Sequence, residues 1–298
     1  MHFKVSSPIS RSKWVTGYSL TELLVTIFIS TSMLTMMTKF THTNLTAREE
    51  GSLKTEVQLG LRALIEMITQ ELRQAGACLP LTGGAIALGG VDNGIQDSLT
   101  VRIGKVDPNT LMCVQAAISQ ATAIGETSLS VDKTSGFRKG GLVYITPEGA
   151  TGGYYFVDDV SGTTLTLSSG ITQDLPKGAG VYAIEQRIYA IDTITFGHPV
   201  LTVAIDGGLS QPLVDWVEEF DVRYYLGPCD LDEAGALSCN STVSLPANVG
   251  EWYSVHVVGI KATVRSHKAD RNGNILRETT GETGQPREYV TIKLRNFL

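Results

Sequence analysis

Hydrophobic residues are gathered in one long run near the N-terminus, and short alternating runs follow over the rest of the chain. The first run begins after Gly17 and extends to about Thr38, with one carboxylate, Glu22, inside it. A run of this length can cross a membrane as a helix, and we expect a span over residues 18–38. Because a carboxylate at bilayer depth costs about 2.5–3.5 kcal/mol, Glu22 is a candidate functional residue.

A second pattern follows the span. Apolar residues recur at steps of three and four, at Leu53, Val57, Leu61, Leu64, Ile68 and Leu72. The other side of this stripe carries Lys54, Glu56, Arg62, Glu66 and Arg73. The pattern predicts an amphipathic helix that ends near Gly76, ahead of Pro80. We therefore expect one long helix over residues 18–76, with a bend or local melting near Gly51, Gly60 and the polar run 41–46.

The rest of the chain has the pattern of short strands. Runs rich in β-branched and aromatic residues, separated by turns that contain glycine, lie at 98–103, 127–131, 142–146, 154–157, 163–167 and 181–184. Strict alternation marks 220–226, 259–265 and 290–295, which predicts an antiparallel sheet with one apolar face covered by the helix. The expected fold is α+β, with a β-rich head over residues 77–298 and a β insert over 114–186.

The segment before the span is basic. It contains Lys4, Arg11 and Lys13 and no acidic residue, which favours a cytoplasmic position for this end. A secretory signal would be cut at small residues beyond its apolar region, and residues 39–44 offer no such site. The small residue precedes the run instead, at Gly17.

Gly17 followed by Tyr18-Ser19-Leu20-Thr21-Glu22-Leu23-Leu24 resembles the processing site of type IV pilins and of the pseudopilins of type II secretion. The resemblance implies that a prepilin peptidase removes residues 1–17 and methylates the new amine of Tyr18. It also implies that Glu22 neutralises the amine of a neighbouring subunit in a filament. Tyr18 stands where the family usually has Phe. The alternative interpretation is an uncleaved signal anchor with an isolated glutamate.

Three later segments narrow the resemblance. They are ITQELRQAGACLP at 68–80, PLVDWVEEFDVRYYL at 212–226 and VTIKLRNF at 290–297, and they are similar to the PilW class of minor pilin. This implies a non-catalytic protein of the inner membrane with a periplasmic head, which primes or caps a pilus. Its partners would be other minor pilins, the major pilin, the prepilin peptidase and the inner-membrane assembly platform. A GspJ-like pseudopilin and a pilus-tip adhesin are the alternatives.

Charge and cysteine content add to this interpretation. Removal of three basic residues with the leader leaves 21 basic against 30 acidic residues, a net charge of −9, which argues against nucleic-acid binding. All four cysteines follow the span, so we expect disulfides, with Cys229 joined to Cys239 and Cys78 to Cys113. A metal site is the alternative, but the chain has no C-x₂₋₄-C pair.

The sequence has no pattern that indicates an enzyme. It lacks a G-x-S-x-G elbow, a P-loop and an H-E-x-x-H helix. We expect His256 to be a core or edge residue rather than a ligand. Two acidic loops, 230–235 and 270–274 with Glu278 beyond, share part of the spacing of calcium loops, but we predict no metal and no cofactor. The pairs Tyr154-Tyr155 and Tyr224-Tyr225 are either adhesive patches or strand residues of which one is buried.

Overall fold

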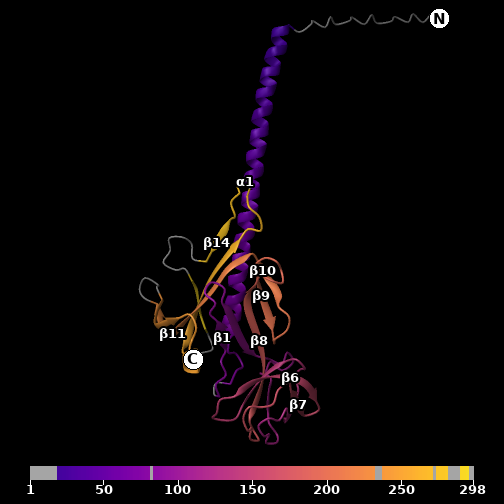
Figure 1. Cartoon of the computed structure of the whole chain (residues 1–298), viewed down its shortest axis with the longest axis vertical. Helices are drawn as coiled ribbons and strands as arrows, with labels where there is room; N and C mark the ends of the chain where they lie inside the picture. The colour runs from indigo at the N-terminus through magenta and orange to yellow at the C-terminus, as the bar shows by residue number, and fades with distance from the viewer. Residues whose placement is uncertain (1–18, 81–82, 232–236, 271–272, 281–288, 295–298) are drawn as a thin grey trace, which may run out of the picture. The chain divides into compact units, whose positions relative to one another are not determined.

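The computed structural model describes residues 19–80, 83–231, 237–270, 273–280 and 289–294 (Figure 1). The chain divides into two compact units, Met1–Ser52 and Leu53–Leu298. The boundary lies inside the first helix, one residue after Gly51. Each unit is therefore described separately below.

The predicted long helix is confirmed. Helix α1 spans Leu20–Gln74 and remains helical through Gly51 and Gly60, so no local melting occurs there. Its second part carries the predicted stripe: Leu53, Val57, Leu64, Ile68 and Leu72 are buried. Leu61 is only partly buried against the same core. The backbone then leaves the helix through Gly76, whose φ of 79° is readily adopted by glycine.

In the part of the chain that the structure describes, the head is made of antiparallel strands with one short helix. They are β1 Leu88–Val91, β2 Ser98–Gly104, β3 Gln115–Ala117, β4 Ser128–Ser130, β5 Leu142–Thr146, β6 Gly153–Ser161, β7 Thr164–Leu167, β8 Gly180–Asp192, β9 Val200–Ile205, β10 Gln211–Asp215, β11 Val217–Leu231, β12 Leu237–Val243, α2 Val249–Tyr253, β13 Val255–Arg265, β14 Arg277–Thr279 and β15 Val290–Lys293. Each predicted strand segment overlaps one of these strands, although the segments 127–131, 163–167 and 290–295 extend beyond β4, β7 and β15. Strands β1, β3, β9, β10, β12 and β14 were not predicted.

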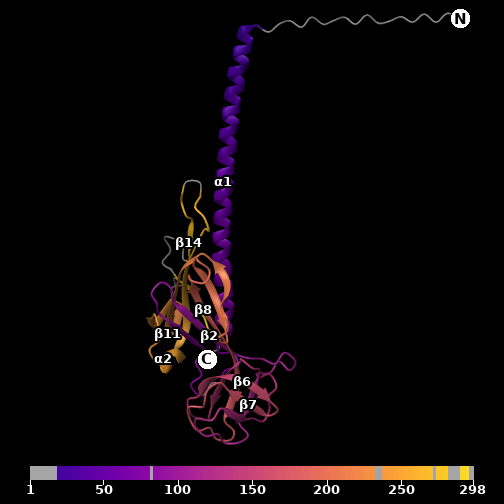
Figure 2. The ribbon, with the colours of Figure 1, turned by 45° about the vertical axis from the view of Figure 1, so that its right-hand side comes forward.

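Two sheets make up the head (Figure 2). The first has the order β1-β2-β8-β5-β6-β7-β4, with β3 and β9 also paired to β8 and β10 paired to β9. The second has the order β12-β11-β13-β14, with β15 paired to β13. The stripe of α1 shares one core with both sheets, including Leu99 of β2, Tyr189 of β8, Phe220 of β11 and Ile260 of β13.

The segment predicted as an insert has a core of its own. Buried residues from Val114 to Ala183 form a cluster separate from the one around α1. Strand β8 connects the two regions, because its first residues pair with β3 and β5 and its later ones with β2 and β9. In Figures 1 and 2, β6 and β7 accordingly lie at the opposite end of β8 from β10.

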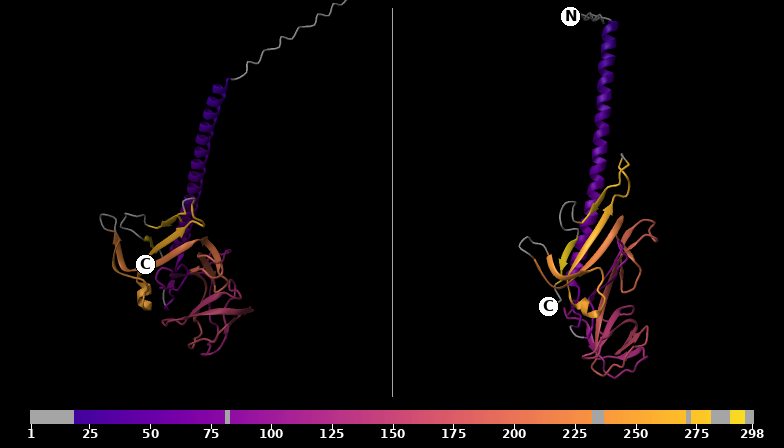
Figure 3. Two further views of the ribbon diagram at one scale, coloured as in Figure 1. Left: turned by 45° about the horizontal axis from the view of Figure 1, so that its top comes forward. Right: turned by 60° about the vertical axis from the view of Figure 1, so that its left-hand side comes forward.

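The C-terminal sheet has the predicted alternation in β11. Phe220, Val222, Tyr224 and Leu226 are buried, whereas Arg223 is exposed. Strand β13 differs, since Gly259 and Thr263 on its other face are buried as well as Ile260, Ala262 and Val264. A side chain at Gly259 would collide with Tyr225, which lies over this central strand. Strand β13 lies inside its sheet, because it pairs with β11 on one side and with β14 and β15 on the other; the strands of this sheet are orange to yellow in Figure 3.

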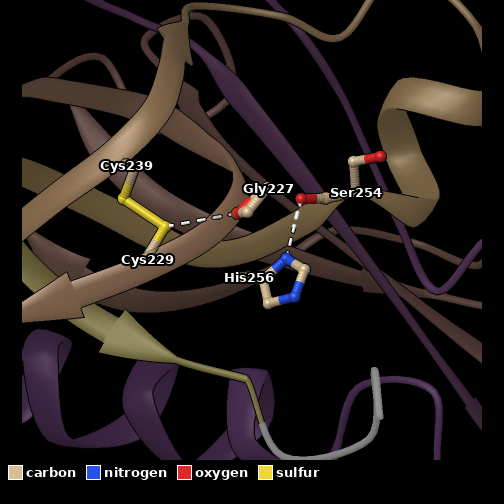
Figure 4. The surroundings of a disulfide bond; sticks show 5 residues. All are labelled: Gly227, Cys229, Cys239, Ser254 and His256. Atoms are coloured by element: carbon tan, nitrogen blue, oxygen red, sulfur yellow. Dashed lines mark hydrogen bonds between the residues drawn. A yellow bond between two sulfur atoms is a disulfide. The ribbon is translucent and has the colours of Figure 1, made fainter.

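Both predicted disulfides are present. Cys78, just after α1, is bonded to Cys113, ahead of β3, and Cys229 of β11 is bonded to Cys239 of β12. Figure 4 shows the second bond, with the Cys229 Sγ 3.7 Å from the Gly227 carbonyl oxygen. The metal-site alternative for the four cysteines is therefore wrong in this structure.

Removal of each disulfide should lower stability according to the loop it closes. The sequence separations are 35 residues for Cys78–Cys113 and 10 for Cys229–Cys239. Chain entropy then predicts losses of about 4 and about 2.7 kcal/mol for the paired Cys→Ala variants. Urea unfolding of the detergent-solubilised chain, followed by the fluorescence of Trp216 and Trp252, measures both. Equal losses, or a larger loss at the short loop, would contradict the loop-entropy explanation.

Candidate assembly segment

The first part of α1 exposes apolar side chains on every side. The residues are Leu20, Leu23, Leu24, Val25, Ile27, Phe28, Ile29, Met33, Leu34, Met36, Met37 and Phe40, each more than half exposed. By length and composition the helix could cross a membrane, and none of its most apolar window is buried. A helix that is apolar all round cannot satisfy that surface in water, so this segment needs an apolar environment from lipid or from other helices.

Eight hydroxyl groups in this segment donate to backbone carbonyls of the same helix. Thr31 donates to the Ile27 carbonyl at 2.8 Å and Ser32 to the Phe28 carbonyl at 2.8 Å. Thr26, Thr35, Thr38, Thr41, Thr43 and Thr46 bond to carbonyls one turn back in the same way. The hydroxyls therefore need no partner from a second helix and do not prevent burial of the segment.

Glu22 lies at the third helical position, where its carboxylate caps the helix. The Ser19 backbone N–H donates to Glu22 Oε2 at 3.1 Å, and the Leu23 N–H donates to the Ser19 carbonyl at 3.1 Å. This is the glutamate half of a capping box, S-x-x-E. The Ser19 hydroxyl lies 2.8 Å from the Thr21 hydroxyl. The spacing of Ser19 and Glu22 is visible in the sequence, although no cap was predicted there.

The two predicted processing residues, Gly17 and Tyr18, lie outside the described residues. The structure therefore places only Glu22 of the three. Its side chain is exposed at the start of α1, within reach of an approaching group. One carboxylate offers about four acceptor sites, so the bond from Ser19 leaves capacity for a further donor.

The second part of α1 is attached to the head by a half-buried ion pair. Glu71, on the buried side of the helix, is bonded to the Arg187 guanidinium of β8. Arg187 Nε also donates to Glu185 at 2.7 Å. Burial raises the pKa of Glu71, and the Arg187 charge opposes this rise. Burial likewise raises the pKa of the neighbouring Tyr189 to about 12, so the phenol stays neutral.

Other candidates from the sequence prove to be structural. The His256 Nδ1 lies 2.9 Å from the Ser254 carbonyl oxygen at the edge of β13, as Figure 4 shows. In each tyrosine pair one member is buried, Tyr155 or Tyr224, and the other is half-buried. Tyr155 bonds to Thr172, and the Tyr154 hydroxyl accepts from the Ile86 N–H. Neither pair therefore forms an exposed adhesive patch.

The two acidic loops are only partly described. Residues 232–236 and 271–272 lie outside the described residues. Asp270 Oδ1 accepts the Asn274 N–H at 2.7 Å, which is a turn interaction. Within the described part of the chain, no three His, Cys, Asp or Glu side chains gather as a metal site would require.

A long apolar N-terminal helix on an antiparallel, disulfide-bonded β head is a pilin-like α+β architecture. No protein-family model and no curated protein matches the chain. The class of fold therefore comes from the arrangement of α1 and the two sheets, and the assignment within that class depends on residues 17–22.

Replacement of Arg187 by methionine should cost about 3 kcal/mol of unfolding free energy, because Glu71 would then lack its buried partner. Since burial raises the pKa of Glu71, the variant should regain stability as the pH falls and the carboxyl takes up a proton. Urea unfolding between about pH 4 and pH 8 measures both effects.

The matched control is Arg62→Met. Arg62 forms an ion pair with Glu66 at 2.8 Å on the exposed side of the same helix. Its loss should cost less than about 0.5 kcal/mol. If Arg187→Met and Arg62→Met lost equal stability, the Glu71–Arg187 ion pair would not be what attaches α1 to the head.

Proposed function

We propose that this chain is a minor pilin of the PilW type. It is made as a membrane-anchored precursor, is cut after Gly17 and joins other minor pilins in a complex that primes or caps a type IV pilus. Its work is assembly rather than catalysis. The major pilin, the prepilin peptidase and the inner-membrane assembly platform are its further partners, and its head lies in the periplasm before it enters the pilus.

One observation carries the proposal. The apolar surface of α1 over residues 20–40 is exposed on all sides, and its single carboxylate, Glu22, stands in the first turn. A buried glutamate among apolar helices must be paired or neutralised. A free amine at the start of a neighbouring helix would supply that pairing, and cleavage after Gly17 would create such an amine.

A GspJ-like pseudopilin of type II secretion is the second candidate. The segment from Val114 to Ala183, with its own core, makes this head larger than the resemblance to GspJ implies. This favours the pilus. Deletion of the gene distinguishes the two, because the pilus assignment predicts loss of pili and of twitching, whereas the secretion assignment predicts exoproteins retained in the periplasm.

Processing is tested by mass spectrometry of the mature protein. We expect an N-terminal methylated Tyr18, because the peptidase would cut at the glycine between the basic leader and the apolar run. Gly17→Leu should leave the precursor uncut, since the enzyme needs a small side chain there. An intact N-terminal Met1, or a cut beyond Phe40, would contradict the proposal.

The role of Glu22 is tested by two substitutions that separate charge from capping. Glu22→Gln can still accept the Ser19 N–H, as Gln does in a capping box, but it lacks the negative charge. Glu22→Val lacks both. If the charge pairs with a neighbouring amine, both variants should insert and be cleaved, and both should fail to copurify with the other minor pilins.

Complementation of a deletion strain gives the readout, as piliation and as copurification. Full activity of Glu22→Gln with loss in Glu22→Val would mean that the residue acts only as a cap. Full activity of both would remove any assembly role for this position.

A further inference from the structure

Strand β12 forms the open edge of the second sheet. Among the residues that the structure describes, it pairs with β11 alone and ends the order β12-β11-β13-β14. Its sequence, LSCNSTV, has neither a charged residue nor a proline, and Ser238, Asn240, Ser241 and Thr242 are exposed. An edge of this kind is a template for pairing with another strand.

The other edges in the described part of the chain carry protection that β12 lacks. Strands β3, β4 and β14 have only three residues each, and β14 also carries Arg277 and Glu278. Strand β1 has four residues. Strand β10 contains Pro212 followed by a register shift, and β15 ends in Lys293. Short length, charge, proline and bulges are the means by which sheets block edge pairing.

The backbone of β12 presents its hydrogen-bonding groups outward in a regular row. Cys229 and Cys239 face each other with Cα atoms 4.2 Å apart, the spacing of a pair that exchanges no ladder bonds. The Cys239 N–H and C=O therefore point away from β11. By alternation, those of Leu237, Ser241 and Val243 do the same. The bulge at this point has its extra residue in β11, where Gly227 and Pro228 oppose Asn240 alone, so β12 itself stays regular.

The sequence of β12 is nearly symmetric about Asn240. An antiparallel pair of two such strands centred there would set Leu237 opposite Val243, Ser238 opposite Thr242 and Cys239 opposite Ser241. Apolar residues then meet apolar residues, hydroxyls meet hydroxyls, and no like charges oppose each other. The outward groups of Cys239 and Ser241 would exchange hydrogen bonds across the two-fold axis.

We propose that β12 is a self-pairing edge, which joins two copies of this chain through an antiparallel β12–β12 contact about a two-fold axis at Asn240. The Cys229–Cys239 disulfide holds the strand in place before the contact forms, which lowers the entropy cost of pairing. Two seven-residue strands bury less than a standard stable interface, so the pairing is weak and must be trapped. This inference does not depend on the function proposed above.

Asn240→Cys in the full-length chain traps the contact. Across the axis the two introduced thiols would stand on Cα atoms about 4.5 Å apart, within disulfide reach. Oxidation of membranes that contain the variant should give a dimer on a non-reducing gel, and peptide mapping should join position 240 to position 240. Leu209→Cys is the control for cross-linking by random collision. Leu209 is 92% exposed and is distant from β12 in the sequence.

A second substitution tests the edge itself. Ser241→Lys in the Asn240→Cys background places like charges beside the axis and should lower the dimer fraction about tenfold. The native Cys229–Cys239 link, checked by the same mapping, shows that the head is still folded. Equal dimer from Leu209→Cys, no effect of Ser241→Lys, or a cross-link from position 240 only to a protein of different mass would each overturn the self-pairing.

Discussion

Burial of the α1 stripe from Leu53 to Leu72 is the contact on which the head depends. Both sheets contribute to the core around it, Leu99 and Tyr189 from the first sheet and Phe220 and Ile260 from the second. At Gly60 the helix lies against both sheets, since a Cβ at this position would be in ordinary van der Waals contact with Val214 of β10 and Val264 of β13, at 3.5 and 3.6 Å. The ion pair between Glu71 and Arg187 then fixes the rotation of the helix, because a buried carboxylate must keep its partner.

The change of pattern within α1 explains how one helix belongs to two compact units. Up to Phe40 the apolar residues surround the helix, whereas after Leu53 they follow one side. The first arrangement suits an environment that is apolar on all sides, and the second suits a sheet on one side and water on the other. This change of pattern can be predicted from the sequence alone, because periodicity is a local property of the chain.

Local patterns predicted α1, the alternating strands and both disulfides, but they did not predict which strands pair with each other. Strands such as β1 and β12 lack the β-branched density that marks a strand, and pairing order depends on residues far apart in sequence. Asp97 is an example: it is buried, and its Oδ2 accepts the Val222 N–H at 2.9 Å across 125 positions. Nothing around Asp97 in the sequence distinguishes it from a solvated loop residue. By contrast, the S-x-x-E cap at Ser19 and Glu22 was open to prediction, because both partners lie within one turn.

That cap also bears on how Glu22 can serve assembly. In the single chain the Ser19 N–H bonds to one carboxylate oxygen, which holds the side chain back along the start of the helix. If Glu22 pairs with an amine of a neighbouring chain, as proposed above, the cap does not compete with that pair, because the bond from Ser19 leaves acceptor sites for a second donor. Burial of the Glu22 carboxylate among apolar helices would cost less free energy with the hydrogen bond from the Ser19 N–H than without it. Under the proposed function, Glu22 would cap its own helix in the single chain and would also pair with a charge of another chain in the assembly.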